Sequence, residues 1–174
     1  MPGYSNITLL SSTNNSAGAS ATVTSNVFDP PNQLIAVVRI AGYSISGIAR
    51  LQFNGDTGTT AYSFSVVSFT GAATPVGTGL SEVSTVAAGI KVSSIAQTTA
   101  RAVMVFHIRN VSGQAHGIVY QSSDSETAAT ASGVVMGSGV WTTTAQITRI
   151  VLDVGSGGGT LSAGTSLDVY GIYG

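Results

Sequence analysis

The feature of this sequence that most constrains its fold is a recurring short run of β-branched and apolar residues, closed each time by Gly, Ser, Thr or Asn. Several of these runs alternate strictly between apolar and mixed positions. In 101–109, for example, Ala102, Met104, Phe106 and Ile108 form one wholly apolar face. Alternation with a period of two residues predicts strands that bury one face.

About ten such runs can be recognised, and short strands separated by turn signals predict an all-β, antiparallel β-sandwich of jelly-roll type. The 174 residues fit a single domain covering 1–174, in which 1–30 form either an extended N-terminal arm or the first strands. The predicted strands are 7–10, 20–25, 33–43, 48–53, 61–69, 100–110, 116–122, 128–136, 144–154 and 165–173.

One segment, 79–92, does not fit the strand pattern clearly. Its apolar residues Leu80, Val83 and Val86 have roughly helical spacing. The β-branched content and Gly89 disfavour a helix. A long loop that covers the end of the sandwich is the alternative.

The chain carries unusually little charge. Charged residues are 7% of the sequence and the net charge is −1, against about 25% charged residues in ordinary globular domains. We therefore expect Ser and Thr to solvate part of the surface and other subunits to bury the rest. The cationic residues are scattered singly, so no nucleic-acid partner is expected.

No membrane partner is expected either, because no apolar run reaches the roughly 18 residues that span a bilayer. The N-terminus also lacks the pattern of a secretory signal peptide. Cysteine is absent, which excludes a disulfide framework and a thiolate zinc site.

The stretch "LQFNGDTGTTAYSF", residues 51–64, contains the strongest turn signal. Asn54 and Gly55 both accept the positive φ of a type I′ turn. The Asp56 side chain can accept a hydrogen bond from the backbone two residues later. Gly58 permits a second tight backbone conformation. We predict a hairpin in which 48–53 pairs with 61–69. A calcium loop is the alternative, but calcium prefers six to eight oxygen ligands and Asp56 is the only local carboxylate.

Other candidates for chemistry are weak. His107 and His116 bracket a turn, without a third metal ligand nearby, and we expect both at an edge or facing solvent.

Asp124 and Glu126 are the only close carboxylate pair, in a Ser-rich loop. "GSGGG" at 155–159 lacks the Lys-Ser/Thr and the following helix of a phosphate loop and predicts a flexible turn. We expect no enzyme, no cofactor and no metal.

Trp141 is the sole tryptophan, and in a β-sandwich such a residue is usually an anchor in the core or at the rim. The alternative interpretation makes it a stacking platform for a sugar ring. The tyrosines that could join such a ligand-contact surface are Tyr43, Tyr62 and Tyr120, together with Tyr170 and Tyr173. All of them fall at strand ends, which suits a rim and equally suits plain packing.

Two stretches together resemble a family of tailed-phage virion proteins: "LQFNGDTGTTAY" at 51–62, and "GSGVWTTTAQITRIVLDVGSGGGTLSAGTSLDVYGI" at 137–172. The resemblance covers 48–173 and departs from the family at Val111, where an aromatic residue is common, and at 164–166. The residues that carry it are Asn54, Gly55, Asp56 and Gly58; Trp141, Ile147, Ile150 and Leu152; and Ala163, Gly164, Val169, Tyr170, Gly171 and Ile172.

The resemblance implies a non-enzymatic structural protein of a bacteriophage particle, assembled in the host cytoplasm. Without a heptad stalk or fibre shaft, the chain fits a capsid decoration or cement protein, or another head or tail surface subunit. Its expected partners are copies of itself, as a trimer, and major capsid or tail proteins. The alternative is a receptor-binding module at a tail-fibre tip that binds a surface glycan.

Overall fold

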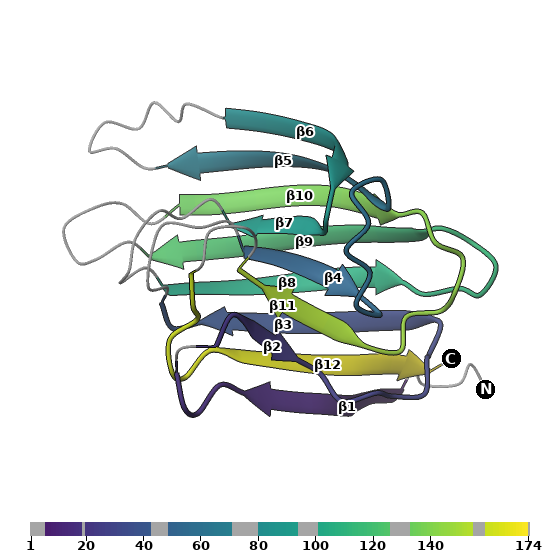
Figure 1. Ribbon diagram of the computed structural model, residues 1–174. Coiled ribbons are helices and arrows are strands. Elements are labelled where there is room, and N and C mark those ends of the chain that lie inside the picture. The colour runs from purple at the N-terminus through teal and green to yellow at the C-terminus, as the bar shows by residue number, and fades with distance from the viewer. Residues whose placement is uncertain are drawn as a thin grey trace.

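The computed structural model describes residues 6–18, 20–42, 49–70, 80–93, 101–125, 133–154 and 159–173, which form two antiparallel sheets packed face to face (Figure 1). The larger sheet has eight strands in the order β1-β12-β3-β8-β9-β10-β5-β6, and the smaller has four in the order β2-β11-β4-β7. The bounds are β1 Asn6–Asn14, β2 Thr22–Thr24, β3 Gln33–Ile40, β4 Ala49–Phe53, β5 Tyr62–Thr70, β6 Leu80–Ala87, β7 Ile90–Ser93, β8 Arg101–Arg109, β9 His116–Ser125, β10 Gly133–Trp141, β11 Ile150–Asp153 and β12 Ser166–Tyr173.

The alternation read in the sequence sets which side chains fill the core. In β8 the apolar set from Ala102 to Ile108 is buried, and the residues between them face outward. The small sheet presents Leu51, Ile90 and Leu152 from the opposite side, and all three are fully buried. The core therefore lies between the two sheets, and the other face of each sheet points away from it.

The prediction of an all-β antiparallel sandwich is confirmed, and the jelly-roll connectivity stays a prediction. Residues from 1–30 contribute β1 and β2 in place of an extended arm. β1 pairs with β12 at one edge of the large sheet, and β2 pairs with β11 in the small sheet.

The predicted hairpin at 51–64 is wrong, although its turn forms. Asn54 and Gly55 have φ of 53° and 74°, and the Asp56 amide donates to the Phe53 carbonyl at 2.9 Å. However, β4 lies in the small sheet between β11 and β7, and β5 lies in the large sheet between β10 and β6. The residues after the turn carry the chain from one sheet to the other, so the two runs never pair.

Both interpretations of 79–92 are also wrong, because the segment forms β6 and β7. β6 is the edge strand beside β5, and β7 pairs with β4 in the small sheet. Gly89, at φ 149°, turns the chain between the sheets, and a side chain there would meet the Leu51 carbonyl oxygen at 3.0 Å. The apolar spacing that resembles a helix belongs to two strands of different sheets.

Candidate functional site

Three of the residues singled out in the sequence come together inside the sandwich. The Trp141 indole donates to Asp56 Oδ2 at 2.9 Å, and Asp56 Oδ1 accepts the Gly58 amide at 2.8 Å. This second bond confirms the predicted bond of Asp56 to its own backbone. The Tyr62 hydroxyl accepts from the Phe53 amide at 2.9 Å and donates to the Asp56 carbonyl at 3.0 Å. Asp56 therefore anchors the turn to the core.

Burial is the main cause that raises the pKa of the Tyr62 hydroxyl well above its ordinary value, and the nearby Asp56 carboxylate acts in the same direction. The hydrogen bond from the Phe53 backbone opposes this effect. The hydroxyl of Tyr62 is consequently a structural donor and acceptor at neutral pH.

His116 completes this interior cluster. Its ring stacks on Trp141 with centroids 5.1 Å apart, and its nitrogens lie 3.2 Å from the Arg109 carbonyl and 2.9 Å from the Ala145 carbonyl. The expectation that His116 faces solvent is wrong, because it shares the inward phase of β9 with Ile118 and Tyr120. That alternation was visible in the sequence and could have placed it.

His107 is exposed, as expected, on the outward face of β8. It lies opposite Val119 in the register between β8 and β9, so the two histidines do not face each other. Among the residues that the structure describes, no group of three His, Cys, Asp or Glu could hold a metal ion.

The anchor interpretation of Trp141 is confirmed, because only 1% of the residue is exposed. Its ring lies 5.6 Å from Phe53 and 6.4 Å from Tyr62 between centroids. Tyr62 and Tyr120 are buried as well, with Tyr120 stacked on Phe106 at 5.1 Å. These three rings have no free face for a sugar, which corrects their assignment to a ligand-contact surface. Tyr43 lies outside the described residues.

Two asparagines hold the segment that follows Trp141. Asn54 donates to the Gln146 carbonyl at 2.9 Å and its Oδ1 accepts the Thr148 and Arg149 amides at 2.9 and 3.1 Å. Asn110 is fully buried. The residue pattern predicts only a turn for Asn54 and no structural role for Asn110.

Asn110 makes its bonds to two separate segments. Its amide donates to the Pro31 and Ile147 carbonyls at 3.0 Å each, and its Oδ1 accepts the Ile147 amide at 2.7 Å. The segment between β10 and β11 is thus fixed by side-chain bonds where no strand partner exists.

The remaining predicted candidates form no site in the described part of the chain. Glu126 and residues 155–158 of the glycine-rich run lie outside it. Asp124 is in β9, opposite Gly133 of β10.

The outward face of the large sheet is the candidate site that the sequence analysis missed. Cross-strand partners share a face, so the registers place on this side every second residue of β1, β12, β3, β8, β9 and β10. Val119 and Met136 are 62% and 52% exposed there. Among the side chains that the structure describes, the exposed large apolar residues on this face are Ile7, Leu9, Val103, Val119, Val134, Met136 and Val140; they define what we term the apolar face.

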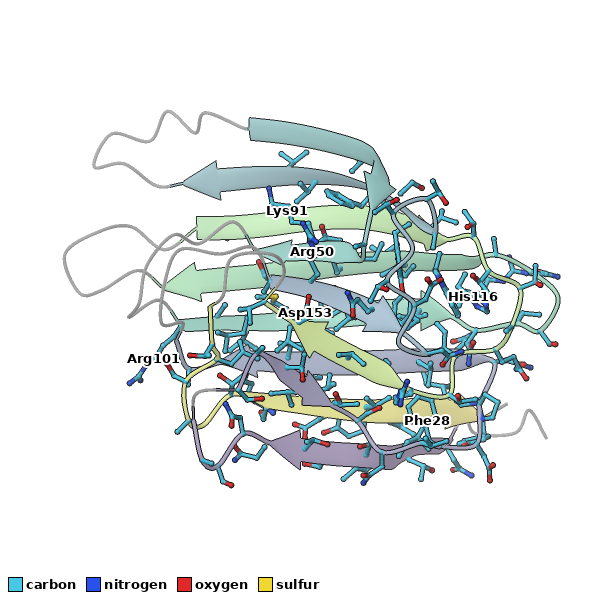
Figure 2. The ribbon with its side chains drawn as sticks, viewed as in Figure 1. Phe28, Arg50, Lys91, Arg101, His116 and Asp153 are labelled. Atoms are coloured by element: carbon cyan, nitrogen blue, oxygen red, sulfur yellow. The ribbon has the colours of Figure 1, made fainter. Side chains whose placement is uncertain are left out.

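Charged side chains also lie on this face. Arg39 pairs with the Asp168 carboxylate, which also accepts the Ser12 hydroxyl at 2.7 Å, so this pair is internally neutralised. Arg101 and Arg109 are exposed at the two ends of β8. The outward side of the small sheet is different, because registers bring Arg50 beside Lys91 and Asp153 (Figure 2). The outer surface of the small sheet therefore holds a cluster of charges, whereas that of the large sheet holds the exposed apolar residues together with charged side chains.

A hollow of about 470 Å³ opens at one end of the apolar face. It lies where β3 and β9 begin and where β8 and β12 end. Gly117 leaves it open, since a Cβ there would have nothing within 4 Å. Its lining residues are Asn32, Gln33, Leu34, His107, Ile108, Arg109, Val111, Gly117, Val119 and Ile172.

Comparison with known proteins gives no relative: no family model, curated protein or solved structure matches this chain. Within the described ranges, the structure has no helix that is long and apolar enough to cross a membrane.

Proposed function

We propose that this chain is a non-enzymatic structural subunit that assembles through the apolar face of its eight-stranded sheet. The observation that carries the proposal is the exposure of seven large apolar residues on that single face. Exposed apolar side chains gathered on one sheet face are costly to leave in water and commonly mark an interaction site.

The dimensions of the face suit a stable interface. Eight strands about 4.8 Å apart and about 25–30 Å long cover roughly 1,000 Å². Standard protein interfaces bury about 800 Å² on each partner. One sheet face can therefore supply a complete interface without contributions from loops.

The charges of the face determine the kind of attraction. Arg39 is already paired with Asp168, and Arg101 and Arg109 at the two ends of β8 carry the same sign. Attraction between copies would therefore depend on apolar burial and little on ion pairs. Added salt screens charges and leaves apolar burial intact, so moderate sodium chloride should not weaken the proposed association.

The sequence resemblance to tailed-phage virion proteins supports the further proposal that this subunit belongs to a phage particle, as a capsid decoration protein or another head or tail surface component. Its partners are copies of itself, with a trimer expected from the resemblance, and the capsid or tail lattice. The glycan-binding alternative based on Trp141 loses its support, because that ring is buried.

Sedimentation velocity at micromolar concentration tests the assembly part. The test variant is Val103→Glu with Met136→Glu, which adds two charges to exposed positions on the apolar face. The control is Val27→Glu, a residue that is 73% exposed in the segment between β2 and β3. We expect self-association to weaken at least tenfold in the double variant and to stay unchanged in the control.

A wild-type chain that stays monomeric at these concentrations, or equal weakening in both variants, would contradict assembly through this face. The location on a particle is tested separately by peptide mass spectrometry of density-purified phage particles from producing cells. Absence of the chain from such particles would remove the virion assignment and leave the assembly result standing.

A further inference from the structure

We propose that the hollow at the end of the apolar face binds a small organic carboxylate that has an apolar body. This inference goes beyond assembly, because it concerns a small ligand and the lining of one depression. Its volume of about 470 Å³ falls within the roughly 300–1,000 Å³ of small-molecule sites.

The strand register explains why the hollow exists. Gln33 lies opposite both Arg109 and Ile172, so three outward side chains form a row across β12, β3 and β8. The next position in β9 is Gly117, which has no side chain to continue the row, and a Cβ there would meet no atom within 4 Å. The outward row is therefore interrupted, and an open depression results.

The charge of the lining favours an anion. Arg109 contributes a guanidinium, and His107, two residues earlier in β8, faces the same outward side. No acidic residue occurs among the described residues that line the hollow. Arginine presents several N–H donors in a planar arrangement that matches a carboxylate. Asn32 and Gln33 add amide groups that can bond to hydroxyl or carbonyl oxygens of a ligand.

The guanidinium is partly held in place. Arg109 Nη2 donates to Gln114 Oε1 at 2.6 Å, and Gln114 belongs to the turn between β8 and β9. This bond occupies one N–H of Arg109 and leaves others for a ligand. A donor that is oriented before binding loses less conformational entropy when the ligand arrives.

The apolar walls define the rest of the ligand. Val119 and Ile172 line the hollow on β9 and β12, and their side chains would pack against a ring or a branched aliphatic group. A bare inorganic anion would leave these walls in water. The combination of one guanidinium and two apolar walls therefore suits a carboxylate on a ring, such as an aromatic acid or an acidic monosaccharide.

The experiment is an NMR titration of isotopically labelled protein, followed at the Gly117 amide and the Arg109 side chain. The probes are benzoate and glucuronate, with the uncharged analogues benzamide and glucose as ligand controls. With one charge pair at an open site we expect a Kd of about 1–10 mM for the better acid, and at least tenfold weaker binding of its analogue. Which acid binds better distinguishes an aromatic acid from a saccharide.

Three variants test the residues. Arg109→Gln removes the charge, and Gly117→Val fills the hollow at a position with free space; both should weaken binding at least tenfold. Arg101→Gln, at the opposite end of β8, is the matched control and should bind like the wild type. Circular dichroism confirms that each variant is folded.

Titration of the Val103→Glu, Met136→Glu variant keeps this proposal separate from assembly, because neither residue lines the hollow. Binding should persist in that variant even when association is lost. The proposal would be overturned if each acid bound no more tightly than its uncharged analogue, that is, benzoate no better than benzamide and glucuronate no better than glucose. Unchanged binding in Arg109→Gln, or no chemical-shift change with any probe, would also overturn it.

Discussion

The two faces of the eight-stranded sheet are both rich in apolar residues, but they are built differently. The inward face holds the large rings, with Trp141 in contact with Phe53, Tyr62 and His116. The outward face holds exposed valines, Ile7, Leu9 and Met136 among charged and polar residues, and no ring stacking is found there among the side chains that the structure describes. The inward face is covered by the small sheet, and the outward face is exposed in this chain.

This difference shows that apolar content alone does not determine burial within one chain. The inward face is fixed by directional bonds, such as that from Trp141 to Asp56, as well as by packing. The outward face has no comparable bonds to a second layer. Side chains of moderate size on a flat sheet suit contact with another protein surface, whereas interlocking rings suit a permanent core.

The largest expected effect is on the inward face. Trp141→Ala removes the centre of the ring cluster and should lower the free energy of unfolding by about 3–5 kcal/mol. For a domain of this size each kcal/mol corresponds to a fall in Tm of about 2–4 °C. Val140→Ala, the outward-facing neighbour, should cost less than about 1 kcal/mol. Similar losses in a chemical denaturation experiment would contradict the distinction between the faces.

Asn110→Ala tests the polar bonds at the end of the sandwich. Loss of its side chain leaves the Pro31 carbonyl and both backbone groups of Ile147 without their partner. Because unsatisfied buried polar groups cost about 1–3 kcal/mol each and relax in part, we expect a loss of about 2–4 kcal/mol. Asn14→Ala, at an exposed position at the end of β1, is the control and should change urea unfolding little.

Tyr62→Phe should cost about 1–2 kcal/mol at pH 7, because the Phe53 amide loses its acceptor. The pKa of Tyr62 is raised in the folded chain, so its contribution is fully present below pH 10. Above that pH the unfolded chain releases the proton first, and stability falls by up to about 1.4 kcal/mol per pH unit. The difference in urea midpoint between the wild type and the variant should therefore shrink from pH 8 through pH 10 to pH 11. A difference that stays constant over this pH range would refute the role of burial.

A charge on the outward face should have a small effect on the isolated chain. Val103→Glu, measured at a dilution where copies are dissociated, should change the free energy of unfolding by no more than about 0.5 kcal/mol. A loss of several kcal/mol would mean that this face is part of the core of a single chain. The comparison between the two faces would then fail.

Chelation should have no effect. The polar groups of the inward cluster, Asp56 and His116, are bonded to other groups of the protein, so folding is not expected to need an ion. Thermal unfolding curves with and without a strong chelator should coincide. A fall of several degrees on chelation would reveal an ion that this account lacks.

Residue type and spacing were enough to predict much of the local structure. A period of two residues in 101–109 set the inward and outward sides of β8, because successive side chains of a strand point to opposite faces. The turn at Asn54 and Gly55, and the bond of Asp56 to the Gly58 amide, also followed from residue type. These features depend on neighbours within a few positions, which is why they could be predicted.

The sheet that each strand joins depends on contacts between distant parts of the chain. The same turn at Asn54 can close a hairpin or direct the chain into the other sheet, and here the Asn54 bonds to Gln146, Thr148 and Arg149 hold it against a segment about 90 residues away. The stacking of His116 on Trp141 exists only because β10 pairs with β9 in this register. The hollow likewise arises only when four strands are aligned. Contacts between distant segments depend on the global pairing of strands, and the local pattern does not encode that pairing.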